Sequence, residues 1–222
     1  MATSWERFEH GWRRAPAEAP ARALVVLLHG VGSDAQDLLP VADQWSATLP
    51  DVAFASLDGS EPFDGGFGGR QWFSLQHVTE ANRGARVVAA YPALRRMLDA
   101  ECARLALSFD RLAMVGFSQG AIMALHHAAT SADAAAAVLA YSGRLALPVG
   151  ARPRTPLTLI HGVDDPVIPV HELERAAHAF SDAGFAVGAF ALPGVGHTIS
   201  NEGVTLGRDA LVRALGTGPR VK

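Results

Sequence analysis

A serine flanked by glycines stands where an apolar stretch gives way to a helical pattern. The residues are Gly116-Phe117-Ser118-Gln119-Gly120, a Gly-x-Ser-x-Gly sequence. At a strand-to-helix turn of this kind the serine adopts a strained backbone conformation, and its hydroxyl stands clear of the sheet. The context is typical of a nucleophile elbow. Taken alone, the pattern suits equally well a serine that only caps the following helix.

A serine hydroxyl is a weak nucleophile, so this interpretation requires a base and a carboxylate that orients the base. His161-Gly162-Val163-Asp164-Asp165-Pro166 follows an apolar stretch, and Gly196-His197 follows the next one. We assign Asp165 as the acid and His197 as the base. Asp164 competes for the acid role, and either aspartate could instead be a helix cap or a solvated turn residue. The order Ser118, Asp165, His197 is that of α/β-hydrolases.

Acyl transfer also needs backbone N–H groups that stabilise an oxyanion. Leu27-Leu28-His29-Gly30-Val31-Gly32 follows the first strongly apolar stretch. In this arrangement one donor comes from the residue after the nucleophile, here Gln119, and the other from this loop, for which we choose Val31. The alternative is that His29-Gly30 is only a tight turn.

The rest of the chain alternates between two patterns. Short aliphatic stretches are separated by longer segments with apolar residues at helical spacing, which predicts a parallel sheet with helices on its faces. The expected strands are Ala23–Leu28, Val52–Ser56, Leu112–Gly116, Ala136–Tyr141, Leu157–His161 and Ala186–Ala191, and the expected helices are Asp34–Thr48, Glu80–Leu107, Gln119–Thr130, Val170–Ala183 and Asn201–Leu215.

These patterns predict an α/β-hydrolase fold with a mostly parallel central sheet and no separate cap domain. We expect one domain over residues 1–222, with its core at about 23–215. Two segments rich in glycine and proline, 57–70 and 144–156, read as loops, and neither is long enough for a second domain.

Composition excludes several classes of protein. The 19 Lys and Arg against 22 Asp and Glu give a net charge of −3, and the basic residues form no single run, so no nucleic-acid partner is expected. Apolar stretches are shorter than the roughly 20 residues of a membrane span, so stable membrane insertion is not expected. The single Cys102 excludes an intrachain disulfide framework. With no signal-peptide core at the N-terminus, we expect a cytoplasmic location.

Other polar residues give no metal or cofactor signature. His126 and His127 are adjacent, so their side chains point in different directions, and we expect surface or hydrogen-bonded histidines rather than metal ligands. The glycines at 65–69 are not followed by the Lys-Ser/Thr of a phosphate-binding loop. We therefore expect neither a metal nor a cofactor.

Taken together, the motifs resemble the carboxylesterase/phospholipase family of α/β-hydrolases, which includes the acyl-protein thioesterases. Within that family, Gly69-Arg70-Gln71-Trp72-Phe73-Ser74 and Thr79-Glu80-Ala81-Asn82-Arg83 are similar to the small bacterial serine esterases. The resemblance covers roughly residues 23–215. The motifs that carry it are Leu28–Ser33, Gly116–Gly120, His161–Pro166 and Gly196–His197.

The resemblance implies hydrolysis of carboxylic esters or thioesters without a metal. It places the nucleophile, acid and base at Ser118, Asp165 and His197, and the oxyanion donors at Val31 and Gln119. We expect a small-molecule ester or thioester with a small to medium acyl chain, cleaved through an acyl-enzyme intermediate. The alternatives are a lysophospholipase or acyl-protein thioesterase with the same triad and, from another class, a non-catalytic binding module. The sequence leaves a homodimer open.

The resemblance also suggests residues that contact substrate. It brings Trp72 and Phe73 beside the nucleophile, although aromatic residues there could equally anchor the loop to the sheet. Val167 and Ile168 follow the acid and would line an acyl tunnel, but as buried apolar residues they need no such role. Arg70 could contact a substrate carboxylate or phosphate, and the alternative is a solvated charge.

Overall fold

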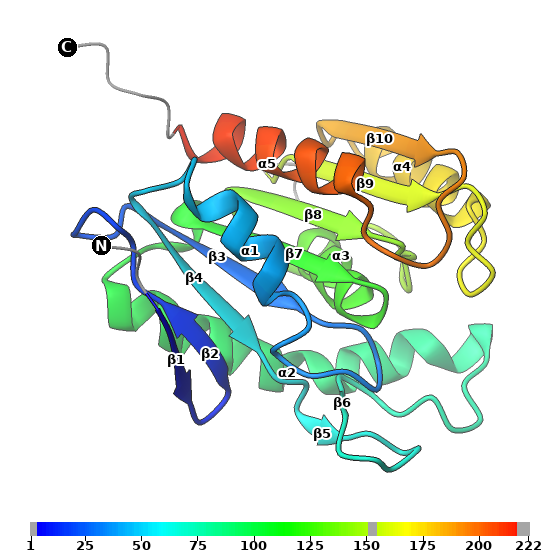
Figure 1. The fold of residues 1–222 in the computed structure, drawn as a ribbon. Coiled ribbons are helices and arrows are strands. Elements are labelled where there is room, and N and C mark those ends of the chain that lie inside the picture. Colours follow the sequence, from blue (N-terminus) through cyan, green and yellow to red (C-terminus); the bar gives the residue numbers. More distant parts are fainter. Residues whose placement is uncertain (1–3, 151–154, 217–222) are drawn as a thin grey trace.

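A computed structural model describes residues 4–150 and 155–216, through which a twisted sheet of eight strands runs (Figure 1). The strand order is β1-β2-β4-β3-β7-β8-β9-β10. Strands from β4 to β10 pair in parallel, while β1 and β2 are antiparallel. The predicted mostly parallel sheet is thus confirmed. The strands are β1 (Trp5–Phe8), β2 (Gly11–Arg14), β3 (Ala23–Leu28), β4 (Val52–Leu57), β7 (Leu112–Phe117), β8 (Ala137–Tyr141), β9 (Leu157–Gly162) and β10 (Val187–Leu192), with a separate small pair β5 (Glu61–Pro62) and β6 (Arg70–Gln71).

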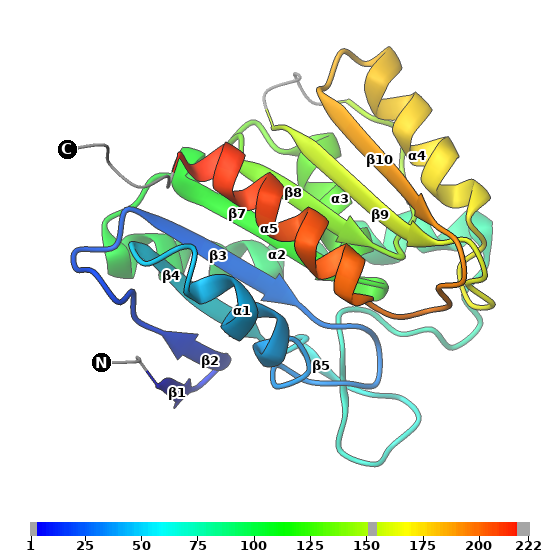
Figure 2. The same ribbon diagram turned by 45° about the horizontal axis from the view of Figure 1, so that its top comes forward.

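Helices cover both faces of the sheet. Helices α1 and α5 lie on one face and α2, α3 and α4 on the other, as the two views in Figures 1 and 2 show. The helices are α1 (Leu39–Ser46), α2 (Glu80–Leu105), α3 (Gln119–Thr130), α4 (His171–Asp182) and α5 (Asn201–Leu215), with a short 3-10 turn η1 (Phe109–Arg111) before β7. None of the helices in the described ranges is both long and apolar enough to cross a membrane.

Strand β3 shows why these residues form a central strand. All six of its residues are buried, and successive side chains point to opposite faces. Leu24, Val26 and Leu28 belong to the core beneath α2, α3 and α4. Ala23, Val25 and Leu27 belong to the core beneath α1 and α5.

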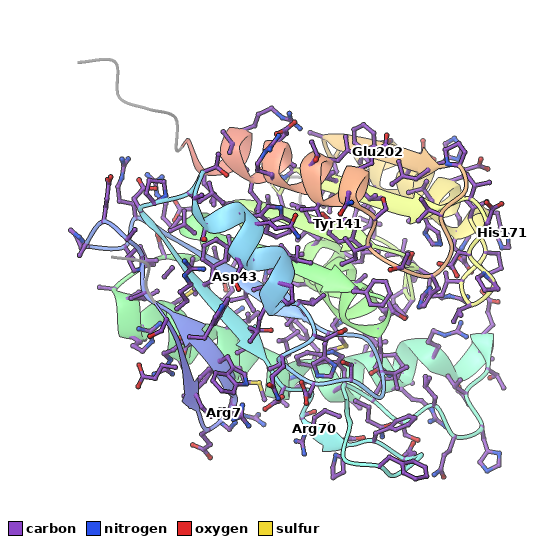
Figure 3. The ribbon with its side chains drawn as sticks, in the orientation of Figure 1. Arg7, Asp43, Arg70, Tyr141, His171 and Glu202 are labelled. Atoms are coloured by element: carbon purple, nitrogen blue, oxygen red, sulfur yellow. The ribbon has the colours of Figure 1, made fainter. Side chains whose placement is uncertain are left out.

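Each of the two cores contains one fully buried tryptophan. Trp72 lies in the core beneath α2 and α3, and Trp45 lies in the core beneath α5. The Trp45 indole N–H donates to the Val204 carbonyl at 2.9 Å, and the Tyr141 hydroxyl donates to the Gly203 carbonyl at 2.9 Å. Tyr141 thus links β8 to the first turn of α5 (Figure 3).

Two local features differ from the sequence prediction. The helix expected over 34–48 starts only at Leu39, because Asp34 accepts the Gln36 N–H at 2.7 Å in a side-chain turn and Pro40 fits only in a helix's first turn. The hairpin β1–β2 was not predicted, since its four-residue strands carry exposed charges and form no apolar run.

The paired histidines of α3 also differ from expectation. The helix lies between the sheet and α2 and is buried along almost its whole length. His126 is 6% exposed and His127 is 0% exposed. His126 Nδ1 and His127 Nε2 have no hydrogen-bond partner among the residues described. The expectation of surface or hydrogen-bonded histidines is therefore wrong for His126, while His127 is buried but has one partner, the Tyr91 hydroxyl, 2.7 Å from its Nδ1.

Candidate active site

Ser118 occupies the turn between β7 and α3. Its backbone angles, φ 52° and ψ −114°, lie in a region that residues with a side chain rarely adopt. The glycines on either side are required by close packing. A Cβ at Gly116 would lie 2.4 Å from the Ala121 nitrogen, and one at Gly120 would lie 2.0 Å from the Leu28 carbonyl oxygen. The turn is therefore held by its neighbours in a conformation that projects the Ser118 side chain.

The Ser118 side chain does not cap the helix. The residue holds the N-cap position of α3, but its hydroxyl makes no hydrogen bond to the first turn. Ser118 Oγ lies 2.9 Å from His197 Nε2 instead. The N-terminus of α3 behind it favours developing negative charge.

His197 and Asp165 continue this line of contacts. His197 Nδ1 lies 2.7 Å from Asp165 Oδ2. The other carboxylate oxygen, Oδ1, accepts the N–H groups of Val167 at 2.8 Å and Ile168 at 2.9 Å. Asp164, the competing acid, is exposed and makes no side-chain contact to His197, and its backbone N–H bonds to the Val195 carbonyl. The contact to the histidine belongs to Asp165.

The environment of Asp165 keeps its carboxylate charged. Burial raises the pKa, but the hydrogen bonds from His197, from the Ile168 and Val167 amides and from the Ser142 hydroxyl outweigh it, so the pKa lies below its ordinary value. A charged carboxylate can only accept at His197 Nδ1, so Nδ1 carries the proton. The lone pair of Nε2 then faces the Ser118 hydroxyl.

The loop after β3 packs directly on the nucleophile. A Cβ at Gly30 would lie 3.4 Å from Ser118 Cβ. Gly32 N–H donates to the Arg70 carbonyl and is therefore occupied. The N–H groups of Val31 and Gln119, by contrast, have no acceptor within the described ranges. These are the two donors that the sequence proposes for an oxyanion.

His29 fastens this loop from behind. Its Nε2 accepts the Gly59 N–H at 2.9 Å, so its proton is on Nδ1, which donates to the Gly30 carbonyl at 2.6 Å. Burial lowers the pKa of His29, which favours this neutral form. His29-Gly30 is more than a tight turn, because the His29 imidazole bridges two loops.

Trp72 and Phe73 are held by the Gln119 side chain. Its Oε1 accepts the Trp72 N–H at 2.7 Å, and its Nε2 donates to the Phe73 carbonyl at 2.7 Å. The Trp72 indole N–H donates to the His29 carbonyl at 2.9 Å. The two aromatic side chains are only 1% and 2% exposed. These contacts favour the interpretation in which both residues anchor the loop.

The two apolar residues after the acid have different surroundings. Val167 is 60% exposed, whereas Ile168 is 6% exposed. The Ile168 carbonyl lies 2.7 Å from Nε2 of the buried His161, and that same nitrogen lies 3.4 Å from Asp165 Oδ2. Of these two residues, only Val167 is accessible to a substrate.

Three contributors to the site were missed in the sequence. His161 packs behind the acid, the Gln119 side chain ties the elbow to the 70–73 segment, and the Phe117 ring lies 4.9 Å from the His197 ring. His161 and Phe117 lie within motifs that the sequence assigns to other residues, and Gln119 is predicted only for its backbone N–H. Their roles depend on contacts across the fold, and only the position of His161 at the end of an apolar stretch could have pointed to the site.

Comparisons with known proteins agree with this geometry. A family model described as Phospholipase/Carboxylesterase matches residues 14–210. Esterase YpfH of Escherichia coli (strain K12) is 36% identical over 195 residues, which cover 87% of this chain and 84% of that protein. Acyl-protein thioesterase 1 of Gibberella zeae is 23% identical over 206 residues, covering 82% and 86% of the two chains.

Solved structures give the same fold. The crystal structure of esterase PE8 has a TM-score of 0.86 and 30% sequence identity, covering 97% of this chain and 100% of the other. The Bacillus cereus carboxylesterase has a TM-score of 0.77 at 16% identity, covering 91% and 92% of the two chains. The expected α/β-hydrolase fold is confirmed, and so is the resemblance to the small bacterial esterases.

Proposed function

The chain belongs to the phospholipase/carboxylesterase family, and from that premise we propose that it is a serine esterase acting on carboxylic esters or thioesters of small to medium acyl chains. One observation carries this proposal. Ser118 Oγ, His197 and Asp165 form a continuous line of contacts of 2.9 and 2.7 Å. Gln119 follows Ser118 in the chain, Val31 follows Gly30, which packs against Ser118, and the N–H groups of both have no acceptor in the described ranges.

In the first half of the reaction, His197 Nε2 takes the proton of Ser118 as Oγ attacks the carbonyl carbon of the ester. The carbonyl oxygen becomes negatively charged and accepts hydrogen bonds from the N–H groups of Val31 and Gln119. The C–O or C–S bond then breaks, and the imidazolium gives its proton to the leaving alcohol or thiol. An acyl group remains on Ser118.

In the second half, water replaces the alcohol. His197 takes a proton from the water, the hydroxide attacks the acyl carbon, and the proton returns to Ser118 Oγ as the carboxylic acid leaves. Asp165 stabilises the imidazolium in both halves and fixes the ring orientation. His29 and Gln119 act indirectly, because they hold the loops that carry the donors.

The proposed preference for small to medium acyl chains rests on which of the predicted substrate contacts are accessible. Of the four predicted substrate contacts, Val167 is exposed beside the acid, whereas Trp72, Phe73 and Ile168 are buried. A lysophospholipase or thioesterase with the same triad remains the second candidate, favoured by the similarity to an acyl-protein thioesterase. Activity on lysophospholipid or on a long-chain thioester above that on short esters would favour it.

The test is hydrolysis of p-nitrophenyl esters of two to sixteen carbons. We expect the wild type to prefer chains below about twelve carbons and Ser118→Ala to lose at least about a thousandfold in kcat/KM. Ser181→Ala, on the exposed surface of α4, is the matched control and should keep full activity. Equal activity of Ser118→Ala and wild type would contradict the nucleophile, and an equally inactive but folded pair would favour the binding-module alternative.

We place this activity in the cytoplasm as part of the same proposal. The single cysteine, Cys102, is buried, and burial raises the pKa of its thiol to about 11, so it is unreactive. A chain with no disulfide suits a reducing compartment. Cell fractionation checks the location, and light scattering decides whether the protein is a monomer or a homodimer.

A further inference from the structure

A cavity of about 570 Å³ lies away from the Ser118 hydroxyl, at the β4 side of the sheet. Its walls come from the hairpin β1–β2, the loop after β4, the start of β6 and helix α2. Figure 3 labels Arg7 and Arg70, which lie at this end of the molecule. We call this cavity the arginine pocket; its polar walls include Arg7, Asp58, Gly59, Arg70 and Arg96.

The arginines of the pocket are unequally paired. Arg7 forms an ion pair with Asp58 at 2.9 Å. Arg70 uses only its Nε, which donates to the Gly59 carbonyl at 2.9 Å, so its two terminal nitrogens are unoccupied within the described ranges. Arg96 has no partner at all among the residues that the structure describes. Glu9 lies at the rim beside His10, and three guanidinium groups therefore face two carboxylates.

The helical wall of the pocket is apolar. Ala93, Met97 and Ala100 are spaced by four and three residues along α2, so they share one face of the helix. Arg96 lies beside them. This combination suits a ligand with an anionic head and a short apolar body, since guanidinium groups recognise carboxylate and phosphate geometry.

Three residues of the pocket wall are hydrogen-bonded to the loop after β3 that presents the Val31 N–H, here called the oxyanion loop. Asp58 Oδ1 accepts the Ala35 N–H at 2.9 Å, and the Gly59 N–H donates to His29 at 2.9 Å. The Arg70 backbone bonds twice, from its carbonyl to Gly32 N–H at 2.8 Å and from its N–H to the Ser33 carbonyl at 2.7 Å. The loop that presents the Val31 N–H is thus attached to the wall on both sides.

From this arrangement we propose that the arginine pocket binds a small organic anion, a carboxylate or phosphate monoester with a short apolar body, and that binding there shifts the oxyanion loop. Arg96 and the terminal nitrogens of Arg70 hold the anionic head, and the α2 surface holds the apolar body. A carboxylate could come from the acid that the proposed esterase releases or from an unrelated metabolite. Binding itself does not depend on the esterase assignment.

Calorimetric titration of the folded Ser118→Ala protein tests binding. Sodium butanoate represents the carboxylate, phenyl phosphate the phosphate monoester and butanamide the uncharged control. Arg96→Gln should weaken the binding of both anions at least about tenfold, and Ala93→Glu should abolish it by placing a carboxylate in the pocket. Arg213→Gln, which changes an exposed arginine of α5, is the matched control and should bind as before.

Two outcomes would overturn the proposal that the arginine pocket binds the anion. One is unchanged butanoate affinity in both Arg96→Gln and Ala93→Glu. The other is loss of binding when Ser118 of the wild type is blocked by a phosphonate, which would place the anion at the active site. Butanoate binding without phenyl phosphate binding would restrict the site to carboxylates such as the released acid, and would support it in that form.

Steady-state kinetics test the link to the oxyanion loop. With a p-nitrophenyl ester, saturating anion should change the wild-type kcat at least twofold, and Arg96→Gln should show no such change. Inhibition that raises KM alone and persists in Arg96→Gln would overturn the link. An enzyme without esterase activity would refute the proposed function and leave the calorimetric result standing.

Discussion

Histidines lie buried or half-buried in two regions of this molecule, and the two regions differ in how the rings are paired. At the catalytic edge, formed by the ends of β3, β7, β9 and β10, both ring nitrogens of His29 and of His197 have partners. Between α2 and α3, His126 and His127 each keep one buried ring nitrogen without a partner in the described ranges. In the proposed mechanism the edge uses histidine to fix and transfer protons, whereas the helix interface uses it mainly as a ring that fills space.

The interface histidines are nevertheless packed specifically. The His127 ring stacks on Phe109 at 5.7 Å, and its Nδ1 lies 2.7 Å from the Tyr91 hydroxyl. The His126 ring meets Tyr91 edge-on at 4.9 Å. Since an unpaired buried nitrogen costs about 1–3 kcal/mol, this region should be the one where stability can be gained or lost most easily.

The two regions should differ most in their effect on the rate of ester hydrolysis. His197→Ala should reduce kcat by at least about a thousandfold while changing the free energy of unfolding by less than about 1 kcal/mol, because the lost group acts on the transition state. Ester hydrolysis and urea unfolding of the same preparation measure the two effects. His178→Ala, on the exposed side of α4, is the control. A variant that keeps a tenth of the activity would show that His197 is not the base.

Acid should destabilise the helix interface. Burial, with a smaller effect of the Arg95 charge, lowers the pKa of His127 to about 4, against 6.5 in the unfolded chain. The unfolded state therefore binds more protons between these values, and stability falls as the pH drops from 6.5 to 4, by about 3 kcal/mol. Burial also lowers the pKa of His126, which acts in the same direction.

Urea unfolding across this pH range measures the effect. His127→Asn, whose amide oxygen can take the place of Nδ1 beside Tyr91, should flatten the pH dependence even though it is less stable at pH 7. His10→Asn, an exposed position, is the control. The same slope in His127→Asn and wild type would mean that another group titrates.

The support of the oxyanion loop should give a smaller, mixed effect. His29→Phe keeps a ring beside Trp72, whose centroid lies 5.5 Å away, but leaves the Gly59 N–H and the Gly30 carbonyl unpaired. We expect a loss of about 2 kcal/mol in stability and about tenfold in kcat, with KM little changed. Phe8→Leu, remote from this loop, should change stability alone. Full kcat in a folded His29→Phe protein would contradict the support role.

The smallest expected effect is a gain in stability. His126→Phe removes the unpartnered Nδ1 and keeps the ring against Tyr91, so the free energy of unfolding at pH 7 should rise by about 1 kcal/mol without a change in activity. Thermal unfolding would detect it. Destabilisation of similar size would indicate that a buried water pairs the nitrogen in solution.

Sequence reasoning located the catalytic edge because each of its motifs directly follows an apolar strand. Parallel strands bring their carboxyl ends to one edge, so Ser118, Asp165 and His197 could be placed together without any knowledge of their contacts. The helix Gln119–Thr130 was predicted to its boundaries, since the strand and the elbow fix its start. The sequence could not choose firmly between Asp164 and Asp165, because that choice depends on which side of a turn faces the histidine.

What sequence reasoning missed depends on contacts between distant segments. The Gln119 amide bonds to residues 46 and 47 positions earlier, and His29 bonds to Gly59, 30 positions later. The hairpin β1–β2 is stabilised by pairing with β4 rather than by its own composition. Burial of His126 and His127 follows from α2 lying over α3, which no local pattern reveals.

The two fully buried tryptophans also make each layer of the fold visible in fluorescence. Trp45 sits beneath α5 and Trp72 beneath α2 and α3, on opposite faces of one sheet. One variant keeps only Trp45 and a second keeps only Trp72, with the other three tryptophans replaced in each. Each protein then has a single emitting indole. Coincident emission changes during denaturation would show that both layers melt as one cooperative unit, and separated changes would show which layer opens first.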